Sequence, residues 1–227
     1  MPTKVDEILL GAVRPFGECG VSSGIDKAPV AGPVELTVNG FVGDGQGDTV
    51  HHGGADKAVH HYASEHYHQW REIIGDKDVL RQPGAFGENL STEGLTEFDV
   101  AVGDIFRIGS AILQVSQGRQ PCWKLNIRFE TDDMARKVQD SGMTGWYYRV
   151  LQPGTLKSGD QLDLIDRIAP AWTVHRLWNA FYVDRQNIDE LRQISTLSVL
   201  PEKWRSYAAR RIETRAVEDW TRRLQAQ

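Results

Sequence analysis

The pattern that decides the fold lies in the stretch Asp104-Ile105-Phe106-Arg107-Ile108-Gly109-Ser110-Ala111-Ile112-Leu113-Gln114-Val115. Two apolar-rich runs flank Gly109-Ser110, which predicts an antiparallel hairpin with a two-residue loop. Further strands are expected at 34–38, 146–151 and 161–165. Many short strands separated by glycine turns favour a barrel or sandwich over a doubly wound sheet.

Two helices are expected to interrupt these strands. Ser64 can cap one helix that carries Tyr67 and Trp70 on one side. Thr131 can cap a second, which Gly142 would stop.

Composition changes sharply along the chain. All 22 glycines lie at or before Gly159, so the last part is expected to be helical. Net charge is −8 over residues 1–171 and +3 over residues 172–227. These shifts predict two units, residues 1–168 and residues 169–227, with the boundary at 168–171.

The second unit reads as three short amphipathic helices. The first follows the helical apolar spacing from Val174 to Phe181, and the second carries Leu191 and Ile194. Pro201 would sit in the first turn of the third, with an apolar stripe formed by Trp204, Ala208, Ile212, Ala216 and Trp220. Its arginines predict a solvated face, with a partner or nucleic-acid surface as the alternative. These arginines are Arg205, Arg210, Arg211, Arg215, Arg222 and Arg223.

Composition and charge exclude several classes of protein. With 227 residues, 40% apolar and 25% charged, the chain has an ordinary globular balance. No apolar run reaches the roughly 18 residues that span a bilayer, and no secretory signal is visible. A net charge of −5 argues against binding nucleic acid by bulk charge. Two cysteines cannot form a disulfide framework, so a cytoplasmic protein with free thiols is expected.

Cys122 is the strongest candidate for chemistry. Pro121 precedes it, which predicts a loop, and Arg119 and Lys124 lie close in sequence. Nearby cations stabilise a thiolate, which can be a nucleophile, a persulfide carrier or a soft metal ligand. The alternative is a buried, inert cysteine, about as probable from these residues alone.

The stretch from His51 to Tyr62 is the second candidate. Gly53-Gly54 after His52 exposes backbone N–H groups, and Lys57 adds a cation, so the segment could cradle a phosphate or form a sharp turn. Six of the seven histidines lie between residues 51 and 68, but their spacing does not match the usual zinc motifs. Asn89, in the polar segment 85–94, could bind a heterocycle edge or tie its own turn.

Taken together, the segments resemble the MOSC family, named for the C-terminal domain of molybdenum cofactor sulfurases. The segments that match, in order, are Lys27–Val30, Gly40–Asp44, His52–Val59, Phe86–Leu90, Gly103–Phe106 and Arg119–Lys124. The last 55 or so residues resemble the three-helix extension of the YiiM-type branch.

This resemblance implies a mixed, mainly β fold: a MOSC-type β-barrel with flanking helices and a small C-terminal helical domain. It implies binding of the molybdenum cofactor, a pterin dithiolene that carries a phosphate. Cys122 matches the cysteine taken to ligate molybdenum, and it would be catalytic together with His52. The residues expected around the pterin and phosphate are Lys27, His52, Lys57, Asn89 and Arg119.

The implied activity is that of a molybdenum-dependent oxidoreductase, which reduces N-hydroxylated compounds such as hydroxylaminopurines to amines. His52, His60 and Asp44 are candidate proton donors. Electrons would come from a separate flavoprotein or ferredoxin-type reductase, and the positive helical unit could dock an acidic flavoprotein. No membrane or nucleic-acid partner and no pyridoxal phosphate are expected, and a homodimer is an open alternative.

Two other functions compete with this one. In the first, the chain is a molybdenum cofactor or sulfur carrier that uses Cys122 without turnover. In the second, it is a thiol enzyme or a hydrolase with a histidine-bound metal, which the loop-borne cysteine between cations fits less well.

Overall fold

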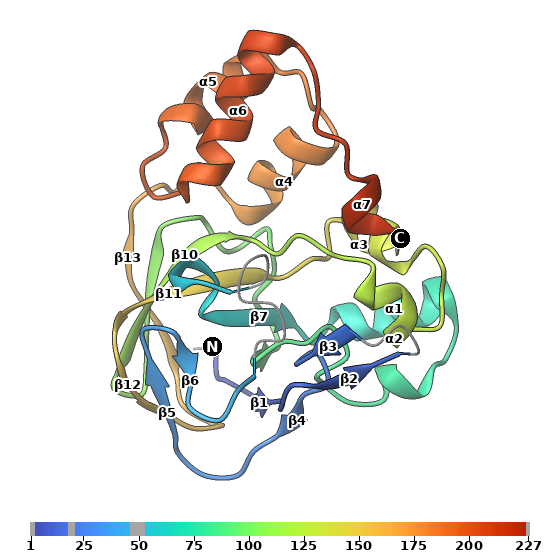
Figure 1. The fold of residues 1–227 in the computed structure, drawn as a ribbon. Helices are drawn as coiled ribbons and strands as arrows, with labels where there is room; N and C mark the ends of the chain where they lie inside the picture. The colour runs from blue at the N-terminus through green and yellow to red at the C-terminus, as the bar shows by residue number, and fades with distance from the viewer. Residues whose placement is uncertain (1–2, 18–20, 46–52, 226–227) are drawn as a thin grey trace.

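The computed structural model describes residues 3–17, 21–45 and 53–225. Its centre is an eight-stranded sheet in the order β13-β9-β10-β11-β7-β8-β1-β4 (Figure 1). The strands of this sheet are β1 (Glu7–Leu10), β4 (Ala28–Pro29), β7 (Val59–Ala63), β8 (Leu90–Thr92), β9 (Asp104–Ile108), β10 (Ala111–Gly118), β11 (Trp146–Gln152) and β13 (Leu162–Arg167).

Two small sheets and several helices complete the described structure. One sheet orders β12-β5-β6 and the other pairs β2 with β3. Their strands are β2 (Arg14–Phe16), β3 (Val21–Ser23), β5 (Val34–Thr37), β6 (Gly40–Phe41) and β12 (Gly154–Leu156). The α-helices are α1 (His66–Ile74), α2 (Lys124–Arg128), α3 (Met134–Ser141), α4 (Val174–Tyr182), α5 (Ile188–Thr196), α6 (Glu202–Thr214) and α7 (Thr221–Leu224), with short 3₁₀ turns at Ala55–Lys57 and Asp78–Leu80.

The predicted hairpin is confirmed. β9 and β10 pair with Ile108 opposite Ala111, which leaves Gly109 and Ser110 as the loop. Backbone hydrogen bonds also join residues 3–5, which lead into β1, to residues 159–162, which lead into β13. These bonds bring two distant parts of the sheet together, so the sheet curls into a half-barrel rather than lying open as a doubly wound sheet would.

The other predicted elements form with small shifts at their ends. β5, β11 and β13 lie where strands are predicted, and α1 and α3 lie where helices are predicted. α1 is preceded by Glu65 rather than capped by Ser64, and α3 by Asp133 rather than Thr131. Gly142 ends α3 in the left-handed conformation, as predicted.

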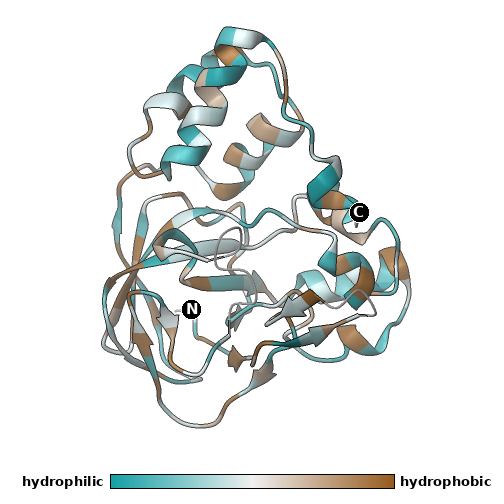
Figure 2. Ribbon diagram, viewed as in Figure 1, coloured by the Kyte–Doolittle hydropathy of each residue, from teal (hydrophilic) through white to brown (hydrophobic). Residues whose placement is uncertain are grey.

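The C-terminal helices pack as amphipathic elements over one side of the sheet (Figure 1). Thr173 caps α4 by accepting a hydrogen bond from the Arg176 amide. The predicted apolar face of α4, from Val174 to Phe181, is buried in the same core as the strands. Figure 2 shows α4 as more apolar than α5 and α6.

The prediction for the third helix is wrong beyond Thr214. Arg215 adopts a left-handed backbone with φ of 54°, which ends α6, so Ala216 and Trp220 do not continue its stripe. Pro201 is the N-cap residue of α6 rather than part of its first turn. The chain instead crosses back toward the sheet and forms α7 (Figure 1).

The expectation of a solvated arginine face is also wrong for Arg211. Its side chain is 1% exposed, and its guanidinium binds both carboxylate oxygens of Glu218 and the carbonyl of Phe181. A buried arginine with these partners serves packing between α6 and the following segment, so it cannot belong to a docking surface.

A fully buried histidine lies at the centre of the large sheet. His61 on β7 places Nδ1 2.9 Å from the Tyr148 hydroxyl and Nε2 2.8 Å from the Thr92 hydroxyl. Burial lowers the pKa of His61 to about 3. The folded protein therefore keeps this ring neutral where an unfolded chain would protonate it.

Acidification should destabilise the protein through His61. Unfolded histidine has a pKa of about 6.5, so between that pH and about 3 the unfolded state binds an extra proton and gains about 1.4 kcal/mol per pH unit. We expect native protein to lose about 2–3 kcal/mol more unfolding free energy than His61→Gln between pH 6.5 and 4.5, measured by urea unfolding. Equal losses in the two proteins would contradict the assignment.

No helix in the described ranges is both long enough and apolar enough to cross a membrane.

Candidate functional site

Cys122 lies on the loop between β10 and α2, as its sequence context predicts. The side chain is 6% exposed and its thiol is free. The Cys122 carbonyl accepts a hydrogen bond from the Leu125 amide at 3.0 Å, which starts the turn of α2. The thiol therefore sits at the end of a central strand, on a short and well-anchored loop.

The residues of α7 hold this loop from the other side. The Trp123 amide donates to the Arg223 carbonyl at 2.8 Å, and the Arg223 guanidinium donates to the Pro121 carbonyl at 2.5 Å. The Asn126 side-chain Nδ2 donates to the Leu224 carbonyl at 3.0 Å. We call this set of bonds the α7 clamp; Figure 1 shows α7 beside α2 and α3.

Cys122 forms part of the wall of an open cavity, which we call the cysteine cavity. Besides Tyr147, the wall takes some of its residues from each of five segments: 23–27, 44–45, 57–60, 86–89 and 119–124. The cavity encloses about 100 Å³, room for a phosphate-sized group or one end of a larger ligand. Several strands thus contribute one loop each to a single site.

The cysteine cavity is rich in positive charge. Among the described residues, Lys27, Lys57, Arg119 and Lys124 line it, and Asp44 supplies the one carboxylate of the wall. Arg119 is 5% exposed, and its Nη1 has no hydrogen-bond partner within the described residues. A buried guanidinium nitrogen without a partner is costly, and an anionic ligand would satisfy it. The donor set therefore fits an anionic group such as a phosphate.

Asp44 organises one side of this cavity. Its carboxylate forms an ion pair with Lys27 and accepts hydrogen bonds from Asn89 Nδ2 at 2.8 Å and from the Gly11 amide at 2.9 Å. Asn89 Oδ1 in turn accepts from the His60 amide at 3.1 Å. Burial lowers the pKa of Lys27, while the charge of Asp44 opposes that shift. Asp44 and Asn89 thus use their polar atoms to fix the Lys27 ammonium on the wall.

Two glycines let the loops of the wall meet. A Cβ atom on Gly24 would lie 1.9 Å from the Gly45 carbonyl oxygen, far inside van der Waals contact. The loop that follows β3 can therefore pack on the loop that carries Asp44 only if residue 24 has no side chain.

His60 and Tyr147 add groups that can hold protons. Burial, reinforced by the charge of Arg119, lowers the pKa of His60 well below its usual range, so its ring is neutral at neutral pH. Desolvation raises the pKa of Tyr147, so its hydroxyl stays protonated. Both residues line the cysteine cavity.

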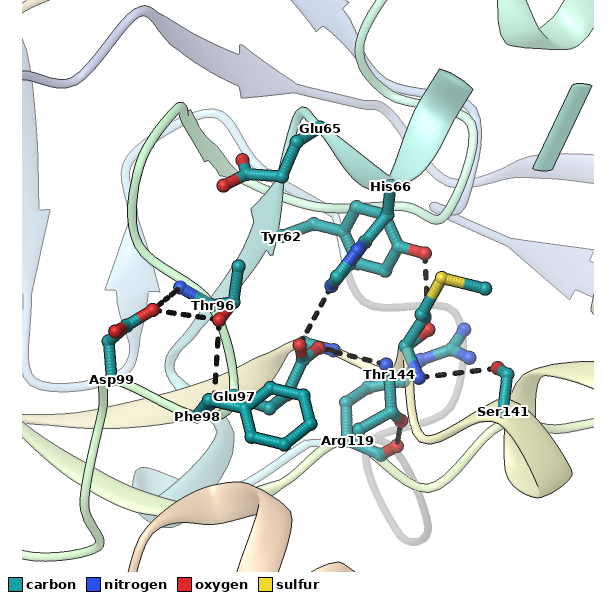
Figure 3. Close-up of polar contacts among 12 residues, drawn as sticks. Tyr62, Glu65, His66, Thr96, Glu97, Phe98, Asp99, Arg119, Ser141 and Thr144 are labelled. Atoms are coloured by element: carbon teal, nitrogen blue, oxygen red, sulfur yellow. Dashed lines mark hydrogen bonds and ion pairs between the residues drawn. The ribbon is translucent and has the colours of Figure 1, made fainter. Parts of the chain in front are cut away.

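The buried carboxylate of Glu97 holds a turn that contacts the backbone of Arg119 (Figure 3). Glu97 accepts hydrogen bonds from the amides of Thr144 at 2.9 Å and Gly145 at 2.7 Å, and from His66 Nε2 at 2.7 Å. The Thr144 hydroxyl donates to the Arg119 carbonyl, and the Arg119 amide donates to the Gly145 carbonyl at 3.0 Å. Glu97 thereby fixes the turn that holds the backbone of Arg119.

The structure brings most of the predicted site residues together. The predicted residues that line the cysteine cavity are Lys27, Lys57, Asn89, Arg119 and Cys122. His52 lies outside the described residues. Sequence reasoning missed Tyr147, which also lines the cavity. Tyr147 sits inside a strand between two other aromatic residues, and nothing in that local pattern distinguishes it.

In the described part of the histidine-rich segment, His61 and His66 have structural roles. Within residues 3–17, 21–45 and 53–225, no group of three or more His, Cys, Asp or Glu side chains could hold a metal ion. His61 bridges Tyr148 and Thr92, and His66 bonds Glu97. These bonds give both rings a role in the core.

The chain matches two families in succession. Residues 48–163 match the MOSC domain, and residues 172–215 match the YiiM-like 3-alpha helix domain. This chain therefore belongs to the MOSC domain family, in its YiiM-like branch.

Individual proteins agree with this assignment. Protein YiiM of Escherichia coli (strain K12) is 37% identical over 218 residues, 96% of each chain. The crystal structure of YiiM from Escherichia coli superposes with a TM-score of 0.82 at 33% identity, covering 100% of both chains. A protein of Gibberella moniliformis named "Reductase" is 37% identical over 155 residues, which are 68% of this chain but 28% of that protein.

Proposed function

We propose that this protein uses the molybdenum cofactor to reduce N-hydroxylated compounds to amines, with electrons from a separate reductase. The reaction consumes two electrons and two protons, breaks the N–O bond, and yields the amine and water. The MOSC family and the relative named "Reductase" suggest an oxidoreductase-like role, and the substrate and cofactor go beyond them.

One observation carries the proposal: a buried thiol shares its cavity with a buried arginine nitrogen that has no hydrogen-bond partner in the part of the chain that the structure describes. Cys122 offers a soft ligand, which suits molybdenum bound to dithiolene sulfur. Arg119 Nη1 offers a donor for a phosphate oxygen. A thiolate and an anion-binding guanidinium on one cavity wall supply the two kinds of ligand, one for a soft metal and one for a phosphate, that a phosphorylated metal–pterin cofactor needs.

The protein would bind and orient the cofactor, and the cofactor would carry out the redox step. When bound, the molybdenum cofactor would supply the two-electron chemistry that breaks the N–O bond. Cys122 would hold the metal, and Lys27, Lys57 and Arg119 would compensate the phosphate charge. The Tyr147 hydroxyl would hold a proton close to the cysteine. Asp44, which already accepts from three donors, would act as a positioning group.

The source of the electrons is part of the proposal as well. Two cysteines cannot hold an iron–sulfur cluster with four cysteine ligands. We therefore propose a separate flavoprotein or ferredoxin-type partner.

Metal content and turnover test the proposal together. Protein would be purified without oxygen from a host that makes the cofactor and from a host that cannot. We expect stoichiometric molybdenum and pterin from the first host only, and oxidation of a reduced dye that requires an N-hydroxylated purine. Protein from the first host without molybdenum would refute the proposal. Sulfane sulfur on Cys122 in that protein would favour the carrier function.

A further inference from the structure

The last helix of the chain supplies a residue that brackets Cys122. The Arg223 carbonyl accepts a hydrogen bond from the Trp123 amide at 2.8 Å, and the Arg223 guanidinium donates through Nη1 to the Pro121 carbonyl at 2.5 Å. Residues 121 and 123 flank the cysteine, so one arginine fixes the backbone on both sides of it. The Cys122 carbonyl is bonded as well, by the Leu125 amide. The backbone that carries the thiol is therefore tightly held.

The Arg223 side chain is itself held by the body of the protein. Its Nη2 donates to Gln139 Oε1 at 2.5 Å, and the guanidinium carbon lies 5.7 Å from the centre of the Tyr182 ring. Gln139 is 1% exposed, and its carbonyl accepts a hydrogen bond from Trp178 Nε1 at 2.8 Å. A planar guanidinium that donates to two acceptors has a defined direction. α3 and α4 thereby orient the arginine that holds the cysteine loop.

α7 is too short to keep this position on its own. It has four residues, Thr221–Leu224, and residues 215–220 before it form neither helix nor strand. Isolated helices shorter than about 12 residues are marginal in water, so α7 depends on its contacts. These contacts include the side chain of Leu224, which is 3% exposed, and the bonds of Arg223 and Asn126 across the α7 clamp. Loss of the Arg223 bonds would therefore let α7 lift from the loop while the sheet stays folded.

Arg223 and the thiol also face a common space. Both residues line a second cavity, which encloses about 450 Å³ between the sheet and the C-terminal helices. Because Arg222 and Arg223 of α7 form part of its wall, the position of α7 sets how far this cavity opens toward the sulfur.

We propose that Arg223 is a positioning residue for Cys122: its bonds hold α7 against the cysteine loop, and α7 in turn keeps the thiol in place and restricts access to it. Arg223 lies outside both ranges of the chain that match a family, residues 48–163 and residues 172–215. The positioning of the thiol requires no cofactor, whereas the expected effect on molybdenum rests on the proposed function.

Alkylation of the thiol in metal-free protein tests this role directly. Full-length Cys19→Ser protein, whose one cysteine is Cys122, would be purified from the host that cannot make the cofactor and treated with iodoacetamide. Rates would be compared at the high-pH plateau, where every thiol is ionised and the rate depends on access alone. In this background we expect Arg223→Ala to react about tenfold faster or more, because opening of the loop no longer breaks two charge-assisted hydrogen bonds.

Two further variants separate the bonds of Arg223 from its charge. Arg222→Ala is the matched control, because Arg222 is the neighbouring arginine on α7 and is exposed. It removes the same charge and should react as fast as the parent protein. Arg223→Lys should react at a rate between those of the parent and Arg223→Ala, since an ammonium keeps the charge but lacks the planar fork that reaches two acceptors. Thermal unfolding would show that each variant is folded at the assay temperature, and Arg223→Lys decides the test if Arg223→Ala is not.

Molybdenum retention extends the test to protein from the cofactor-producing host. During dialysis, Arg223→Ala should lose molybdenum about tenfold faster than native protein, and Arg222→Ala should lose it at the native rate. Equal alkylation rates in the parent and Arg223→Ala, or an equal rise in both arginine variants, would overturn the positioning role. A lack of molybdenum in every protein would refute the proposed function alone, because the alkylation rates still decide the role of Arg223.

Discussion

Replacing Cys122 by serine should abolish molybdenum binding and turnover while the protein stays folded. Serine has nearly the same shape as cysteine, so the core loses little packing. No disulfide is lost either, because Cys122 is a free cysteine. The hydroxyl is a hard and weakly acidic group that cannot replace a soft thiolate as a ligand. Molybdenum per chain and the thermal unfolding temperature of Cys122→Ser, compared with native protein, measure the two effects.

Cys19→Ser is the matched control, because Cys19 is the other cysteine of the chain. It should retain molybdenum and activity. Full molybdenum content in Cys122→Ser would show that the metal is held elsewhere, and equal loss in both variants would point to general damage rather than ligand loss.

Glu97→Ala should lower the unfolding free energy by about 3–5 kcal/mol. The substitution leaves the amides of Thr144 and Gly145 and the ring of His66 without their acceptor in a buried site. Urea unfolding measures the loss. Because the same turn holds the Arg119 backbone, cofactor content should fall as well.

Glu93→Ala provides the comparison, since Glu93 is an exposed glutamate four residues away. Its effect should stay within about 0.5 kcal/mol. A loss below about 1 kcal/mol in Glu97→Ala would mean that water replaces the carboxylate, and that the turn does not depend on it.

Local patterns predicted the elements whose causes are local. The hairpin at 104–115 follows from two apolar runs and a short polar turn, and α4 follows from an apolar spacing that continues to Phe181. The end of α6 could not be predicted, because Arg215 stops the helix by a backbone conformation that its residue type does not favour. The helix starts shifted by one or two residues. Neither Glu65 nor Asp133 makes a side-chain cap bond, and the Thr131 hydroxyl donates to the Phe129 carbonyl instead of capping α3.

The part of the candidate site that stands in compact sequence motifs could be predicted. Lys57, Asn89 and Cys122 stand in recognisable segments, and the fold brings those segments to one cavity. Tyr147 and the residues between 203 and 223 that line the other side of Cys122 belong to no recognisable motif. They come close to Cys122 only through the packing of distant segments. The role of Glu97 was hidden for the same reason, since its partners lie 31 to 48 residues away in sequence.

The α7 clamp sets an order of events during synthesis. Arg223 bonds Pro121 across 102 positions in the sequence, so a ribosome completes the β10 strand and the cysteine loop long before it adds the residue that holds them. At about 5–20 residues per second, that interval is on the order of 5–20 seconds. The nascent chain therefore passes through a stage in which the sheet can form while the thiol loop is unclamped. A ligand that needs the finished pocket has to be inserted after translation has passed α7.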